Sequence, residues 1–333
     1  MKIIKKIMVK SRLSMLNALL LVFAAAMTSC STIDDDLSNC GRDYSIDYTL
    51  HLVTNIETEL STVLYAETDQ VIADALRDEL SQNIFREFAA DVNLAFYGTD
   101  DQLEKHEIEQ MNANQASYTI YLPVKEYTHL ALANIANAGS VSLDGYDHAS
   151  TSTLVQAKGD TIDSHSTGLF TARQKMEVLA DQDQDFLIPL YMANSAAAIV
   201  IDTAGYRVRD VRTYINKVGD SFALRDSIYT YNSNTVIRMN DVQLPESTRK
   251  VCRYGVCFPS SDEGGWEIRC YVTLEDGTVT ENILTVSTPL QAGQLKILTV
   301  KLTDQGVIEV TTTEASVSVT LDWKQGGTYE PTM

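Results

Sequence analysis

The chain has 333 residues, with 26 basic and 45 acidic side chains and a formal net charge of −19. A body this acidic does not bind nucleic acid by neutralising phosphates, and it does not adhere to an anionic membrane by charge. We therefore expect no nucleic-acid partner, and we attribute the acidity to a well-solvated surface.

Residues 1–29 have the pattern of an export signal. Five basic residues and no acid accompany an apolar run at 16–27, which is shorter than the roughly 20 residues that span a membrane. The following Met27-Thr28-Ser29-Cys30 resembles the lipobox of bacterial lipoproteins. We predict cleavage between Ser29 and Cys30 and a diacylglyceryl group on Cys30. An ordinary signal peptide with an incidental cysteine is the alternative.

Residues 30–43 are expected to form an acidic tether between the lipid and the folded body. Losing the five basic residues of the signal would change the net charge from −19 to −19 − 5 = −24. The acidic run Asp34-Asp35-Asp36 resembles the signal that sends some lipoproteins to the outer face of the outer membrane. More than one acyl chain anchors a protein stably, at about 0.8 kcal/mol for each buried CH₂.

Four cysteines remain after lipidation of Cys30, and export to an oxidising compartment allows disulfides. Cys40, Cys252 and Cys257 are the candidates for a disulfide, and sequence alone does not select a pairing. Cys270 lies on the apolar face of a predicted strand, so we expect it to be a buried free thiol.

The first predicted domain covers residues 44–190. Strict alternation over 44–52 predicts a half-buried strand. Apolar residues spaced by four over 69–88 predict an amphipathic helix that lies on a sheet. Further strand candidates are 92–97, 117–122, 127–134, 175–179 and 186–190. The pair that flanks Pro123 is expected to form a hairpin, and 137–165 is expected to be mostly loop with one short strand as an option.

The second predicted domain covers residues 191–333 and has an almost entirely β pattern. The clearest alternation runs over 266–274 and ends at an Asp276-Gly277 turn. Short strands at regular intervals predict a β-sandwich. The other candidates are 197–202, 207–215, 236–239, 283–286, 295–302, 307–312 and 317–323.

The sequence lacks the motifs of familiar enzymes and metal sites. None of its five histidines has the spacing of a helical zinc site, and no nucleophile elbow, P-loop or dinucleotide fingerprint occurs. Asp181-x-Asp183-x-Asp185 opens like a calcium loop but lacks its glycine and its terminal glutamate. We expect no enzyme, no metal and no cofactor.

Several segments together resemble a known family. They are Cys30 followed by Ile33-Asp34-Asp35-Asp36-Leu37-Ser38-x-Cys40, Leu122-Pro123 before Tyr127, and Val317-x-Val319-x-Leu321-Asp322-Trp323. In order and spacing they resemble the FimB-like fimbrial anchor lipoproteins. One departure is Ala133 before Asn134, where the family usually has a tryptophan and a glycine.

The resemblance implies two transthyretin-like β-sandwich domains and a role as the basal anchor of a type V pilus. It further implies that the chain keeps its lipid in the outer membrane. We expect it to accept a donor strand from the adjacent fimbrial subunit by β-augmentation.

Two other functions stay open from the sequence. The chain could be a stalk or tip adhesin subunit, whose precursor is cut after a basic residue with loss of the lipid and the first strand. Arg42 is the candidate processing site. A surface glycan-binding lipoprotein is the other alternative, although Trp266 and Trp323 fall on strand faces where a core position is expected.

Overall fold

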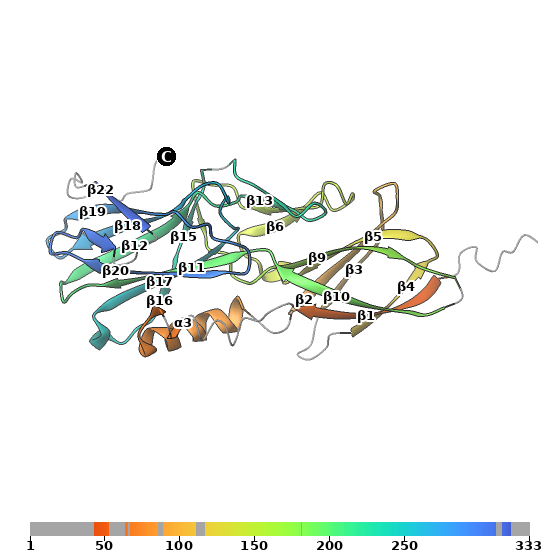
Figure 1. The fold of residues 1–333 in the computed structure, drawn as a ribbon, viewed down its shortest axis with the longest axis horizontal. Coiled ribbons are helices and arrows are strands. Elements are labelled where there is room, and N and C mark those ends of the chain that lie inside the picture. Colours follow the sequence, from red (N-terminus) through yellow and green to blue (C-terminus); the bar gives the residue numbers. More distant parts are fainter. Residues whose placement is uncertain are drawn as a thin grey trace, which may run out of the picture.

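The computed structural model describes residues 43–52, 64–65, 67–85, 89–110, 117–180, 182–232, 234–310 and 315–320. Two lobes of strands follow one another along the long axis, and helix α3 (Gln70–Asn83) lies along one face of the second lobe (Figure 1). In this part of the chain, no helix is long and apolar enough to cross a membrane.

The first lobe is a sandwich made from a seven-stranded sheet that folds over on itself, with strand order β3-β2-β5-β9-β10-β1-β4. Strand β10 pairs with β1 over 184–190 and with β9 at its last two residues, so it passes from one layer to the other. Alternate residues of the two layers meet in the core. The strands are β1 (Asp43–Leu52), β2 (Asp91–Tyr97), β3 (Leu103–Gln110), β4 (Ser117–Pro123), β5 (Glu126–Ala133), β9 (Phe170–Glu177) and β10 (Gln184–Met192).

The second lobe is a sandwich of a five-stranded sheet, β16-β17-β11-β20-β21, and a six-stranded sheet, β22-β19-β18-β12-β15-β8. Their inner faces enclose a separate core that contains Trp266, which is fully buried. The first sheet comprises β11 (Ser195–Asp202), β16 (Asn240–Val242), β17 (Lys250–Cys257), β20 (Leu295–Leu302) and β21 (Ile308–Val310). The second comprises β8 (Thr161–Asp163), β12 (Val208–Asn216), β15 (Val236–Arg238), β18 (Trp266–Leu274), β19 (Val279–Val286) and β22 (Ala315–Thr320).

Helix α3 covers the outer face of the sheet that contains β11 and β17. Its buried stripe, Ile72, Leu76 and Leu80, belongs to one core cluster with Ala198 and Tyr254 of that sheet. The same cluster continues into the first sandwich. The helix therefore comes from the first half of the sequence but packs against strands of the second half, and β11 is buried on both faces.

A small four-stranded sheet, β14-β13-β7-β6, covers the outer face of β2 and β5. Phe222 and Leu154 of this sheet pack with Tyr97 and Leu130 of the first sandwich. Two of its strands precede β10 in sequence and two follow β11, so it joins the lobes. The strands are β6 (Val141–Asp144), β7 (Thr153–Gln156), β13 (Ser221–Ala223) and β14 (Ile228–Thr230), and short 3₁₀ turns occupy η2 (Ile135–Asn137) and η3 (Glu246–Thr248).

Residues 165–169, which we call the junction segment, connect both lobes and the end of the helix. The Asn194 amide donates to the Thr167 carbonyl (2.9 Å), and its oxygen accepts from the Leu169 N–H (3.1 Å). The Asn134 amide donates to the Gly168 carbonyl at 2.8 Å. A Cβ on Gly168 would lie 2.0 Å from the Ile84 carbonyl oxygen, so only glycine fits there.

The prediction of a mainly β fold with β-sandwich domains and an amphipathic helix is confirmed. The expected hairpin around Pro123 is wrong, because β4 pairs with β1 while β5 pairs with β2 and β9. The chain there passes between layers, and the inward faces of β4 and β5 meet across the core. The expected loop at 137–165 contains three short strands. We propose 190/191 as the boundary between the two sandwiches. Strands β6, β7 and β8 precede this boundary in sequence but belong to the four-stranded sheet or to the second sandwich.

Acid should destabilise the fold through two buried histidines. Burial lowers the pKa of His129 to about 4 and that of His165 to about 3. The unfolded chain, with histidine pKa values near 6.5, binds protons that the folded chain excludes, so stability is complete above about pH 6.5 and falls as pH drops toward 4. We expect a loss of about 1.4 kcal/mol per pH unit for each histidine.

The free energy of urea unfolding, measured between about pH 7 and pH 5, gives this slope. The matched variants His165→Gln and His129→Gln cannot take up the proton, so each should flatten the slope. A double variant with the slope of the unmodified chain would contradict the assignment.

Candidate strand-exchange site

Strand β1 fills a groove between β4 and β10. It pairs antiparallel with β4, with Ile46 opposite Ile120, and parallel with β10, with Leu50 opposite Ile188. The parallel partner β10 comes more than a hundred residues later in the chain, as a parallel pair needs a long connection. Because β1 is hydrogen-bonded on both edges, it occupies the position that an added strand would take.

The side chains of β1 alternate between the core and solvent. Tyr44, Ile46 and Leu50 point inward and are between 0% and 6% exposed. On the outer face, the Thr119 hydroxyl of β4 donates to the Asp47 carboxylate at 2.5 Å. Fully burying an aliphatic or aromatic side chain contributes about 1.5–3 kcal/mol, so β1 is a substantial part of the first core.

The positions of basic residues decide whether proteolysis could remove β1. No lysine or arginine occurs between Arg42 and Arg77. Arg42 immediately precedes β1, and Arg77 lies inside helix α3. A cut after Arg42 would leave the groove filled, and a cut after Arg77 would break the helix that covers the second lobe.

With β1 in place, β4 forms one edge of the first sandwich. Within the described residues, β4 pairs with β1 alone, and Tyr121 on its outer face is 54% exposed. The Lys105 ammonium, from β3 at the other end of the sheet order, donates to the Tyr121 carbonyl at 2.9 Å. A lysine at an edge is a common protection against unwanted strand pairing.

The residues predicted for lipidation and processing lie outside the described part of the chain. They are Ser29, Cys30, Cys40 and Arg42. The lipid, the cleavage and any disulfide of Cys40 therefore stay predictions.

The other three cysteines are buried free thiols, and burial raises the pKa of each to about 12. Cys252 and Cys257 belong to different core clusters on opposite faces of β17, so the structure forms no bridge between them. Cys270 lies in the second core, as its strand pattern predicts. The described residues contain no group of three histidine, cysteine or acidic side chains that could hold a metal ion.

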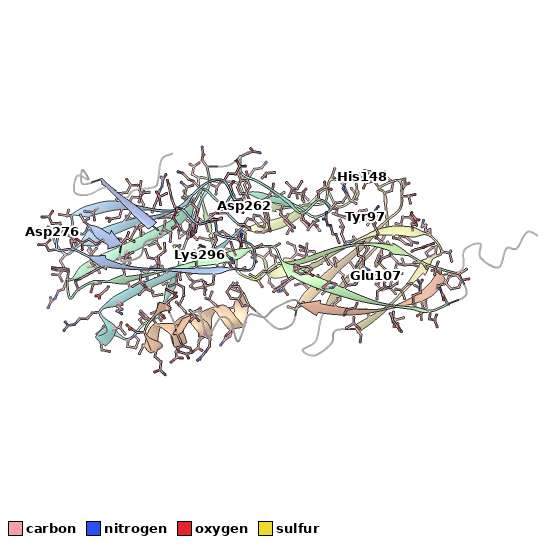
Figure 2. All side chains as sticks on the ribbon, viewed as in Figure 1. Tyr97, Glu107, His148, Asp262, Asp276 and Lys296 are labelled. Atoms are coloured by element: carbon pink, nitrogen blue, oxygen red, sulfur yellow. The ribbon has the colours of Figure 1, made fainter. Side chains whose placement is uncertain are left out.

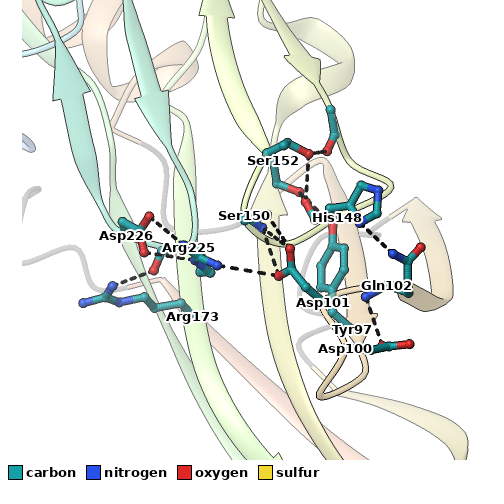
Figure 3. A network of polar contacts seen from close by, with 12 residues as sticks. Tyr97, Asp100, Asp101, Gln102, His148, Ser150, Ser152, Arg173, Arg225 and Asp226 are labelled. Atoms are coloured by element: carbon teal, nitrogen blue, oxygen red, sulfur yellow. Dashed lines mark hydrogen bonds and ion pairs between the residues drawn. The ribbon is translucent and has the colours of Figure 1, made fainter.

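A polar network joins the first lobe to the four-stranded sheet (Figure 3). Arg225, in the turn between β13 and β14, binds Asp226 (3.0 Å) and lies 3.7 Å from Asp101 of the β2–β3 turn. Asp101 also accepts from the Ser150 N–H at 3.1 Å. Tyr97 and His148 lie close by in this region (Figure 2), where the Tyr97 hydroxyl donates to the Tyr146 carbonyl.

Sequence reasoning missed this network because its members are far apart along the chain. One available signal was the alternation Arg173-x-Lys175 on β9, which places two cations on one strand face. The Arg173 guanidinium donates to the Arg225 carbonyl at 2.6 Å.

Comparisons with known proteins agree with the fold. The family model of fimbrillin-A associated anchor proteins Mfa1 and Mfa2 matches residues 65–325. A candidate adhesin from Bacteroides ovatus has 9% identity and a TM-score of 0.51, over 88% of this chain and 98% of its own. A candidate polysaccharide-binding protein from Bacteroides thetaiotaomicron has 10% identity and a TM-score of 0.51, over 82% and 97%.

The fimbrial anchor protein Mfa2 from Porphyromonas gingivalis has 12% identity and a TM-score of 0.49, over 84% of this chain and 98% of its own. At such identities the two structures with a TM-score of 0.51 show a shared fold alone. No curated protein sequence matches this chain.

Proteolysis should distinguish a retained β1 from a removable one. We expect an arginine-specific protease that cuts after Arg42 to leave a body that begins at Asp43 and unfolds at the same urea concentration as the intact chain. A Thr54→Arg variant gains a cleavage site between β1 and α3. Its cut body should unfold at lower urea, because β1 is then held without a covalent link.

Intact mass and urea unfolding measure both outcomes, with Thr54→Gln as the uncut control. Release of β1 from the unmodified chain under native conditions would show that the groove can be emptied.

Proposed function

This chain belongs to the family of fimbrillin-A associated anchor proteins Mfa1 and Mfa2, and from that membership we propose that it is the membrane-held base of a fimbrium. In this proposal the lipid on Cys30 fixes the chain in the outer membrane. The folded body is joined to the adjacent fimbrial subunit by strand exchange, in which it accepts a donor strand.

The observation that favours an anchor over a stalk subunit is the lack of a basic residue between β1 and α3. A stalk-type cut would have to remove β1 and open the groove, and the only basic residues near it lie at Arg42 and Arg77. β1 therefore stays with the body, and the tether predicted at residues 30–43, whose last residue is the first of β1, connects it to the lipid.

The donor strand must then bind while β1 still occupies the groove between β4 and β10. A strand tethered to its own body has a high effective concentration, so a separate subunit competes poorly for the same place. Among the described residues, β4 is the terminal strand of its sheet and pairs with β1 alone, and such an edge beside an existing layer is the geometry of β-augmentation. We propose this edge as the acceptor, with Lys105 moving away from the Tyr121 carbonyl when a strand adds there.

Deletion of the gene should release fimbriae into the medium, because their base is no longer tethered. Complementation with Cys30→Ala should fail to retain them, while complementation with the unmodified chain restores them. Immunoblots for the major fimbrial subunit measure how much of it stays on the cells and how much is in the medium. Cys40→Ala serves as the matched cysteine control. Normal amounts of cell-attached fimbriae in the deletion strain would refute the anchor role and favour a tip subunit.

Fixing β1 to β4 with a disulfide should leave the attachment of the fimbrial subunit intact. Asp47 and Thr119 are opposite one another with their side-chain oxygens in contact, so Asp47→Cys with Thr119→Cys can bridge β1 to β4. We expect cells with the oxidised pair to retain as many fimbriae as cells with either single variant. Loss of fimbriae only when the bridge is oxidised would mean that the donor strand displaces β1.

A further inference from the structure

Three adjoining cavities form a groove along the outer face of β5 and β9, up to the β13–β14 turn. Their volumes are about 750, 370 and 370 Å³. The first and second share Thr128, Lys175 and Arg225, and the second and third share Arg173. The groove lies away from β1 and β4, so it is separate from the proposed strand-exchange edge.

The middle of the groove is basic in a chain that is strongly acidic overall. Arg173 and Lys175 are exposed and point to the same side of β9. Among the described residues, neither has a carboxylate within ion-pair distance, whereas Arg225 is neutralised by Asp226 and Asp101. Figure 3 shows Arg173 beside this pair, where it interacts electrostatically with Asp226 without forming a direct ion pair. Arg173 and Lys175 are therefore the cations of the groove that no direct ion pair with a described residue holds.

The two ends of the groove have different chemistry. Glu126 and Glu177 line the first cavity and are exposed, so their oxygens can accept hydrogen bonds. Tyr191 lines the third cavity, is 59% exposed, and is the cross-strand partner of Thr171. From residue 171 to residue 175 the strand rises about 13 Å, at about 3.3 Å per residue.

We propose that this groove binds a short acidic oligosaccharide, one whose sugar carboxylate lies between Arg173 and Lys175. A guanidinium matches a carboxylate in two parallel hydrogen bonds, and the ammonium adds a second charge. A neighbouring sugar ring packs its apolar face on Tyr191, while hydroxyl groups at the other end donate to Glu126 and Glu177.

The mixed charge of the groove selects against other anions. Glu126, Glu177 and the overall net charge of −19 repel a continuous polyanion such as a nucleic acid. A saccharide carries isolated carboxylates between neutral hydroxyl groups, so it matches both the cations Arg173 and Lys175 and the flanking acids. This binding is an adhesive activity beyond the proposed anchoring and does not depend on it.

The test uses the full mature chain and a panel of immobilised saccharides that contain uronic or sialic acid. Each one is paired with its carboxyl-reduced counterpart, which keeps the sugar chain but lacks the charge. We expect binding to acidic members that is lost on reduction and weakened by salt. Arg173→Gln and Lys175→Gln should each weaken it at least about tenfold, as expected when a charge-assisted hydrogen bond is lost.

Tyr191→Ala should weaken binding of the same saccharides, which separates ring stacking from simple charge attraction. The matched controls are Arg207→Gln and Tyr206→Ala, an exposed cation and an exposed tyrosine outside the groove, and both should bind like the unmodified chain. Urea unfolding of each variant checks that its fold is intact. Equal binding to acidic and reduced members, binding to none, or equal losses in the controls would each overturn the proposal.

Discussion

The junction segment is the constraint on which the rest of the structure depends. Residues 165–169 carry no catalytic pattern, yet buried Asn134 and Asn194 hold them from the first sandwich and from the start of the second. The Gly168 N–H also donates to the Asn83 carbonyl, at the end of helix α3 (3.2 Å). Buried polar groups are costly when unpaired, so these bonds stabilise this arrangement of the two lobes and the helix.

The lobes share one continuous core cluster through the helix and β11, although the second lobe also has its own inward-facing core. β10 leads into β11 through two residues, and the Tyr229 hydroxyl donates to the Ala193 carbonyl between them at 2.7 Å. The four-stranded sheet and helix α3 each bridge the halves of the sequence. Domains joined by short, polar linkers are expected to move, whereas a shared apolar core removes that freedom.

The sequence predicted the elements better than their partners. Period-two and period-four patterns located β1, β18 and α3, because side-chain burial on one face is a local property of the chain. The β4–β5 hairpin prediction failed because adjacency in sequence does not say which layer a strand enters. β17 was missed because Arg253 and Gly255 interrupt its apolar pattern. In the structure, the arginine donates to the Val211 carbonyl (3.1 Å) and the glycine makes room for Ile215. The sequence could place Arg173 and Lys175 on one strand face, but it could not show the groove, because strands far apart in the chain form it.

The way β1 is held fits a chain that carries load between a membrane and a fibre. Under the proposed function, a pull on the fibre is resisted at the lipid, and the force enters the body at Asp43, the first residue of β1. That force acts along the strand, so the hydrogen bonds to β4 and β10 share it instead of opening one after another. The inward Tyr44, Ile46 and Leu50 would have to leave the core together. A strand held in this way resists withdrawal, which is the property that an uncleaved first strand needs if the lipid is to hold the fibre.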